Sequence, residues 1–170
     1  MDPFATLGIP RTYAVDLVAL EKTHRELSRA LHPDRYVDAG ASARRAALTK
    51  AVEVNEAWRI VRDPIRRADA LLELGGVPTG EEARNTASPE FLMEMLEQRE
   101  ALAEAKQARD LAAIRRMAAA VEAQSAGAER ALGEGFARGQ AAELAGKVAE
   151  LRFYRRFLDE VSAIEDELAA

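Results

Sequence analysis

The tripeptide His32-Pro33-Asp34 sets an imidazole and a carboxylate on either side of a proline. Proline has no backbone N–H and disfavours helical geometry in the residue before it, so the amphipathic segment 17–31 is predicted to end there. Asp34 would then be displayed on a turn, where its carboxylate could accept a charge-assisted hydrogen bond from a partner. A match of three residues also arises by chance, and an ordinary solvated turn is the alternative interpretation.

The helix predicted before this turn has an apolar side and a basic side. The apolar side carries Leu17, Leu20, Leu27 and Leu31, and His24 falls among them. The opposite side carries Lys22, Arg25 and Arg29, which we call the basic stripe. The pattern predicts an anchored helix whose basic stripe leads to the exposed carboxylate.

Catalysis and metal binding are weaker interpretations of the same residues. His32 and Asp34 could exchange protons with a substrate, but they are expected on an exposed loop with no second acid or nucleophile nearby. His24, His32 and Asp34 are close in sequence, yet His24 projects to the apolar side, where a packed imidazole is commoner than a metal ligand. The chain also lacks cysteine, which excludes disulfides and thiolate chemistry. We therefore expect no enzyme activity, no metal and no cofactor.

Composition predicts an all-α protein. Alanine, leucine, glutamate and arginine dominate the 170 residues, aromatic residues make up 5%, and no β-branched run alternates with period two. The net charge of −5 argues against a nucleic-acid partner. No stretch is apolar enough to cross a bilayer, so we expect a soluble, cytoplasmic protein with no membrane partner.

The first half predicts a short helical turn and three longer helices. Residues 2–10 form the turn, closed by Gly8, and Asp16 caps the first long helix. The expected core anchors of the turn are Phe4, Leu7 and Ile9. After a polar loop at 35–41, a second long helix spans about 42–62. Its apolar residues at helical spacing are Ala47, Ala51, Val54, Trp58 and Val61.

Local signals place the remaining boundaries of this half. Trp58 should pack against the first long helix. Asp63-Pro64 should end one helix and begin the next, which Gly75-Gly76 then stops. We read residues 1–75 as one domain and residues 76–88 as a linker, because the linker has no periodic apolar residues.

Residues 89–170 predict an antiparallel bundle of three helices, over about 89–107, 110–132 and 140–168. Gly133, Gly135 and Gly139 are expected to break the chain between the last two helices. The apolar residues of the second helix are Leu111, Ile114, Ala118, Val121, Ala128 and Leu132, and those of the third are Leu144, Val148, Leu151, Leu158 and Val161.

The helix at 89–107 has two apolar faces. One face, sufficient to pack the helix into the bundle, carries Phe91, Met95, Leu102 and Ala105. The second carries an apolar patch of Leu92, Met93 and Leu96, followed by Glu97, Glu100 and Glu104. The patch is either a docking surface, with methionine supplying adaptable packing, or part of a wide core face beside solvated glutamates. Phe153, opposite the main apolar face of the last helix, is either packed against the first domain or offered to a partner.

Several segments together resemble one family, HscB, the J-type co-chaperone of iron–sulfur cluster assembly. In the first half these are Asp2-Pro3-Phe4, Leu7-Gly8-Ile9, His32-Pro33-Asp34-Arg35-Tyr36, Asn55-Glu56-Ala57-Trp58, Asp63-Pro64-Ile65-Arg66-Arg67-Ala68 and Leu71-Leu72. In the second half they are Phe91-Leu92-Met93-Glu94, Leu96-Glu97, Arg99-Glu100 and Leu151-Arg152-Phe153. Arg35, where lysine is usual, and Ala70, where an aromatic residue is common, depart from the family pattern.

The resemblance implies an L-shaped protein with an N-terminal J domain and a C-terminal three-helix bundle. It implies that the J domain binds an HscA-type, DnaK-like chaperone and stimulates its ATPase, through His32, Pro33 and Asp34 together with the basic stripe. It implies that the bundle binds the scaffold protein IscU through Leu92, Met93, Leu96, Glu97, Glu100, Glu104 and Phe153. A J protein for another client, or a helical adaptor without a chaperone, are the alternatives.

Overall fold

The computed structural model describes residues 1–79 and 87–170, and within them every regular element is a helix. The backbone divides into two compact units, Met1–Gly76 and Val77–Ala170. The prediction of an all-α fold is confirmed. Among the described residues, no helix combines the length and the apolar composition that crossing a bilayer would require.

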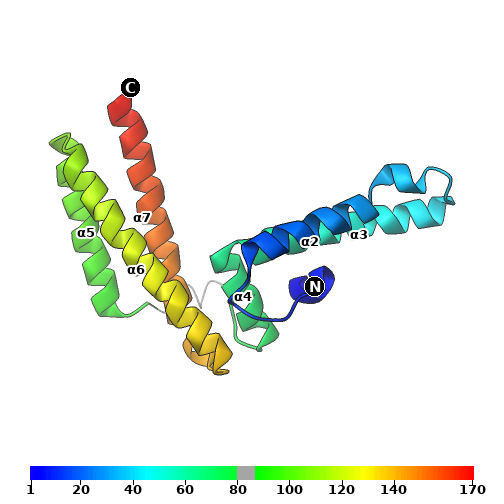
Figure 1. Cartoon of the computed structure of the whole chain (residues 1–170). Coiled ribbons are helices and arrows are strands. Elements are labelled where there is room, and N and C mark those ends of the chain that lie inside the picture. Colours follow the sequence, from blue (N-terminus) through cyan, green and yellow to red (C-terminus); the bar gives the residue numbers. More distant parts are fainter. Residues whose placement is uncertain (80–86) are drawn as a thin grey trace. The chain divides into compact units, whose positions relative to one another are not determined.

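The first unit is organised around its longest helix. Its helices are α1 (Pro3–Leu7), α2 (Leu17–Ala30), α3 (Ala41–Arg62) and α4 (Pro64–Leu74), with a single 3₁₀ turn at Pro33–Tyr36. α3 contacts α1, α2, α4 and the 3₁₀ turn, and it runs alongside α2 as a helical hairpin (Figure 1). The core of this unit includes Phe4, Leu7, Leu20, Val54, Ala57, Val61 and Leu72.

Carboxylates set the starts of three helices in this unit. Asp2, Asp16 and Asp63 each accept hydrogen bonds from free backbone N–H groups in the first turn of the helix that follows, which is the usual role of aspartate at an N-cap. Asp63 also closes α3, and Gly8 ends α1 at φ +67°. The predicted capping of α2 by Asp16 and the predicted break at Asp63-Pro64 are therefore confirmed.

The second unit is a bundle of α5 (Pro89–Gln107), α6 (Leu111–Ala137) and α7 (Ala145–Ala169), with a 3₁₀ turn at Ala141–Glu143. The chain reverses direction at each connection, and each helix contacts the other two (Figure 1). The largest of the deeply buried side chains include Leu102, Ile114, Val121, Leu132, Val148 and Phe157.

The glycines near the end of α6 contradict one sequence prediction. Gly133 and Gly135 do not break the chain, because α6 continues to Ala137, and the turn falls at Gly139, with φ +73°. A Cβ on Gly135 would lie 2.6 Å from Leu144 Cδ2. Gly135 therefore packs closely against Leu144. This packing accounts for a glycine inside a helix, where glycine is otherwise unfavourable.

Two alanine substitutions in α6 separate helix propensity from packing. Gly127→Ala should raise the free energy of unfolding by about 0.5–1 kcal/mol, because alanine favours the helix, and its Cβ would meet only the Arg130 guanidinium, at 3.8 Å. Gly135→Ala should lower it, because overpacking against Leu144 costs about 1–3 kcal/mol. Urea unfolding followed by circular dichroism measures both changes. Equal gains in the two variants would contradict the close approach at Gly135.

Candidate functional site

The His32-Pro33-Asp34 segment forms a well-defined turn at the end of α2. His32 caps the 3₁₀ turn, and its Nδ1 accepts a hydrogen bond from the Asp34 backbone N–H at 3.3 Å. The Tyr36 hydroxyl donates to the Ala30 carbonyl oxygen at 3.2 Å, which ties the turn back to α2. The Asp34 side chain remains 86% exposed. The segment thus holds its own backbone in place, and the Asp34 carboxylate, whose Oδ2 lies 3.5 Å from His32 Nδ1, is exposed to a partner.

The basic stripe is exposed, as predicted, but it is not purely basic. The Arg25 guanidinium donates a hydrogen bond to Glu21, and Lys22 Nζ lies 4.0 Å from Glu26 Oε1. The hydrogen bond and positive charge of Arg25 hold the pKa of the Glu21 carboxyl below its ordinary range. Arg29 makes no ion pair with the part of the chain that the structure describes. These two glutamates were not predicted as partners of the stripe, although each lies four residues from a cation in the sequence.

The apolar side of α2 is narrower than predicted. Leu20 is buried, and Leu27 and Leu31 are half-buried, but Leu17 is 53% exposed and does not join the core. Leu17 is the first residue of α2, and Leu20, one turn further on, is the buried one.

His24 helps to attach α2 to α3. Its ring stacks on the Trp58 ring with centroids 4.4 Å apart, and its Nε2 lies 2.8 Å from Asn55 Oδ1. The Arg62 guanidinium also lies over the Trp58 ring, at 4.3 Å. The predicted packing of Trp58 against the first long helix is confirmed. Across residues 1–79 and 87–170, no three histidine, aspartate or glutamate side chains come together as a metal site would need.

The buried face of α5 is the one that the sequence predicted. Phe91, Met95, Leu102 and Ala105 are all buried. The Phe91 ring meets Phe153 and Tyr154 edge-on, with centroids 5.7 and 5.6 Å apart. Burial, reinforced by the charges of Glu150 and Glu94, raises the pKa of Tyr154 to about 12. Tyr154 therefore stays protonated at neutral pH and acts as a packing residue.

The apolar patch of α5 is open to solvent. Leu92, Met93 and Leu96 are 43%, 58% and 51% exposed. Glu97, Glu100 and Glu104 are exposed beside them. A wide core face would have buried these residues, so the exposures favour the docking interpretation.

Phe153 lies at the junction of α5 and α7. It is half-buried, because its ring packs edge-on against Phe91. The Arg156 guanidinium lies 5.2 Å from the centre of the same ring. These two residues line a small cleft with Met95, Arg99 and Phe157. The sequence identified Phe153 as a site residue but missed Arg156, because the cleft that these two residues share with Arg99 forms only in the folded bundle.

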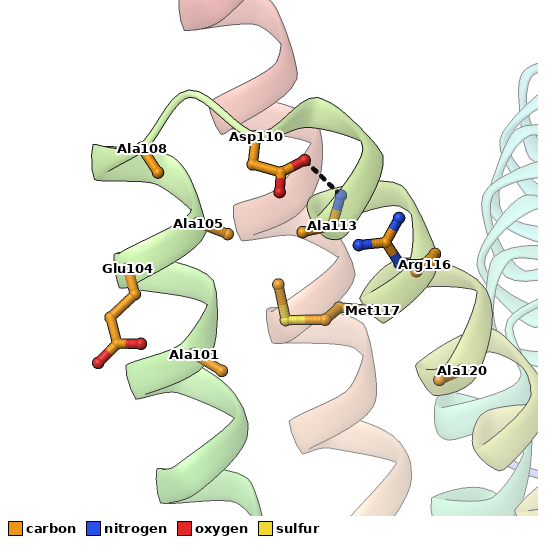
Figure 2. Close-up of a pocket in the computed structure, with 9 residues that line it drawn as sticks. All are labelled: Ala101, Glu104, Ala105, Ala108, Asp110, Ala113, Arg116, Met117 and Ala120. Carbon is orange, nitrogen blue, oxygen red and sulfur yellow. Dashed lines mark hydrogen bonds between the residues drawn. The ribbon is translucent and has the colours of Figure 1, made fainter.

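An open groove of about 550 Å³ lies between the end of α5 and the start of α6 (Figure 2). Alanines and Met117 make up most of its lining. Asp110 uses its carboxylate to cap α6, accepting from the Ala113 N–H at 2.9 Å, and the Glu104 side chain extends away from Arg116 (Figure 2). The groove therefore gathers no set of groups suited to acid–base or nucleophilic catalysis.

Known proteins of similar sequence match nearly the whole chain. Residues 87–162 match the family model described as the HscB C-terminal oligomerisation domain. A co-chaperone HscB homologue of Cupriavidus taiwanensis is 35% identical over 167 residues, covering 98% of this chain and 95% of the relative. Another, of Bordetella pertussis, is 37% identical over 165 residues, covering 96% of each.

Solved structures agree with these matches. The chaperone HscB from Vibrio cholerae superposes with a TM-score of 0.86 at 30% identity, covering 99% of both chains. Human co-chaperone protein HscB superposes with the same TM-score of 0.86 over 96% of this chain and 81% of that one. Its identity of 23% supports the likeness of fold alone.

The two sides of α5 should differ sharply in their contribution to stability. Phe91→Ala removes a buried ring, and we expect it to lower the free energy of unfolding by about 3–5 kcal/mol. Changing Leu92, Met93 and Leu96 together to alanine should lower it by less than about 1.5 kcal/mol, because the three side chains are exposed. Urea unfolding followed by circular dichroism compares the variants. A patch variant as unstable as Phe91→Ala would place the patch in the core.

Proposed function

The chain belongs to the HscB family of co-chaperones, and from this premise we propose that it brings an IscU-type iron–sulfur scaffold protein to a chaperone of the HscA or DnaK type and stimulates the ATPase of that chaperone. A J domain at residues 1–75 would bind the chaperone, a bundle at 89–170 would bind the scaffold, and residues 76–88 would link them. The protein itself would catalyse no reaction and hold no cofactor. We expect it to act in the cytoplasm.

The turn after α2 supplies the proposed switch on the chaperone. His32 and Pro33 hold the backbone of the turn, and the exposed Asp34 carboxylate would accept a charge-assisted hydrogen bond, for example from an arginine of the chaperone. The basic stripe would steer the approach to an acidic chaperone surface and set the orientation of the complex. In this proposal, α2 orients the complex with the chaperone, and Asp34 triggers ATP hydrolysis.

The exposed apolar patch of α5 is the observation that most directly supports a cargo-binding role for the bundle. Burying Leu92, Met93 and Leu96 against a partner would contribute on the order of 5 kcal/mol before the costs of association. Glu97, Glu100 and Glu104 would then meet basic residues at the border of the contact. Because both partners bind one chain, the scaffold would reach the chaperone at a high effective concentration.

Asp34→Asn should abolish stimulation of the chaperone ATPase and leave the fold intact. Loss of one partner from a desolvated charge pair costs about 2–5 kcal/mol, whereas the exposed side chain contributes little to stability. Steady-state ATP hydrolysis at increasing concentrations of the protein measures the effect. Asp38→Asn, which changes another exposed aspartate close to the turn, is the matched control and should stimulate normally. Normal stimulation by Asp34→Asn would exclude the proposed role of this carboxylate.

Replacing Leu92, Met93 and Leu96 together by alanine should abolish binding to the IscU-type scaffold from the same genome. The contact would lose most of its apolar area, and isothermal titration calorimetry measures the loss. Leu111→Ala, which shortens an exposed leucine of α6, should bind as the wild type does. The triple variant should still stimulate the chaperone in the absence of scaffold.

The wild-type titration tests the choice of cargo. If the wild-type protein stimulates the chaperone but does not bind the scaffold, the chain is a J protein for a different client. The iron–sulfur assignment would then have to be withdrawn. If it stimulates no chaperone of this class, the interpretation as a helical adaptor is favoured.

A further inference from the structure

The exposed side of α5 includes two adjacent rows of residues with different chemistry. Residues spaced by three or four positions lie above one another on a helix. One row is Leu92, Leu96 and Arg99. The other row is Met93, Glu97, Glu100 and Glu104. The first row lies on the α7 side, because Arg99 Nη2 is 3.2 Å from Glu160 Oε2 on α7.

A cation continues this surface across α7. The exposed Arg156 guanidinium lies over the half-buried ring of Phe153, and both residues line the cleft that Arg99 also borders. On the path from Arg156, across Phe153, Leu92 and Leu96, to the glutamates of α5, the surface therefore changes from cationic to apolar to anionic. The neighbouring Arg99 and Glu160 side chains neutralise each other. This order could not be read from either helix alone.

Arg156 differs from Arg99 in its ionic partners. Arg99 is paired with Glu160, whereas Arg156 forms no ion pair with any residue in the described parts of the chain. Its contact is with the face of the Phe153 ring, an interaction that leaves the N–H donors of the guanidinium edge available. The Phe153 ring therefore holds the Arg156 guanidinium in place, and no carboxylate of the described residues neutralises its charge.

Covering Phe153 with a partner has a consequence for this guanidinium. Because Arg156 lies over the ring, a side chain that packs on Phe153 also removes water from Arg156. A desolvated charge is costly unless an opposite charge and hydrogen-bond acceptors compensate it. A carboxylate meets both requirements, since its two oxygens can accept paired hydrogen bonds from one guanidinium.

We propose that the protein bound by the bundle places a carboxylate against Arg156, beside the apolar side chain that covers Phe153. This inference rests on the proposed function and identifies the chemistry of its cargo. The contact surface of the IscU-type scaffold would carry an acidic residue facing α7 and basic residues facing Glu97, Glu100 and Glu104. A cargo docked in the reverse orientation would oppose like charges at both ends, so the charge order selects one orientation.

The test compares three substitutions in the full chain by isothermal titration calorimetry against the IscU-type scaffold. Arg156→Glu should weaken binding by about tenfold or more, because it opposes two carboxylates. Arg156→Lys keeps the charge and should weaken binding by less than about threefold. Arg155→Glu makes the same change in net charge one position away on α7, and should leave the affinity within about twofold of the wild type. Circular dichroism establishes that each variant is folded.

A charge exchange then locates the carboxylate. Aspartates and glutamates of the scaffold surface are changed one at a time to arginine, and one of these variants should bind Arg156→Glu more tightly than it binds the wild-type protein. Affinity of Arg156→Glu within twofold of the wild type would overturn the inference and leave the proposed function standing. Failure of the wild-type protein to bind the scaffold would overturn both.

Discussion

A helix in a three-helix bundle can bury only the side that faces its two neighbours, and this limit determines what α5 presents to solvent. Phe91, Met95 and Leu102 occupy the buried side and satisfy the packing requirement of the helix. Leucine and methionine on the remaining surface therefore lie outside the core of the bundle and are exposed. The arrangement of the helices therefore explains why these hydrophobic residues are exposed. The charges around them select which proteins can bind there.

In the first unit, too, a helix buries only the side that faces its neighbour, but its outward side is charged. α2 is attached to α3 by Leu20 in the core and by the stacking of His24 on Trp58, which leaves the outward side of α2 for charged residues. The proline after α2 then ends the helix at a defined point and positions the Asp34 carboxylate immediately beyond it. Helix packing thus orients the charged side, and a backbone constraint places the acidic group.

Local chemistry explains which features were predictable from the sequence. Aspartates at helix starts, Gly8 at a helix end and Pro64 in a first turn act through neighbouring residues, so a sequence reveals them. The spacing of Phe91, Met95 and Leu102 is likewise a local pattern. Gly135 was misread because its role depends on Leu144, which comes from beyond the next turn. The stacking of Arg156 on Phe153 could be suspected from their spacing, but the cleft that they share with Arg99 depends on how α7 lies against α5.

The position of Trp58 makes the two units distinguishable by spectroscopy. It is the only tryptophan of the chain, and it lies between His24 and Arg62 where α2 meets α3. Indole emission therefore reports on the packing of the first unit, whereas the helical signal in circular dichroism sums over both. Any divergence between the two unfolding curves would measure how far the J domain and the bundle fold independently, without a label or an added chromophore.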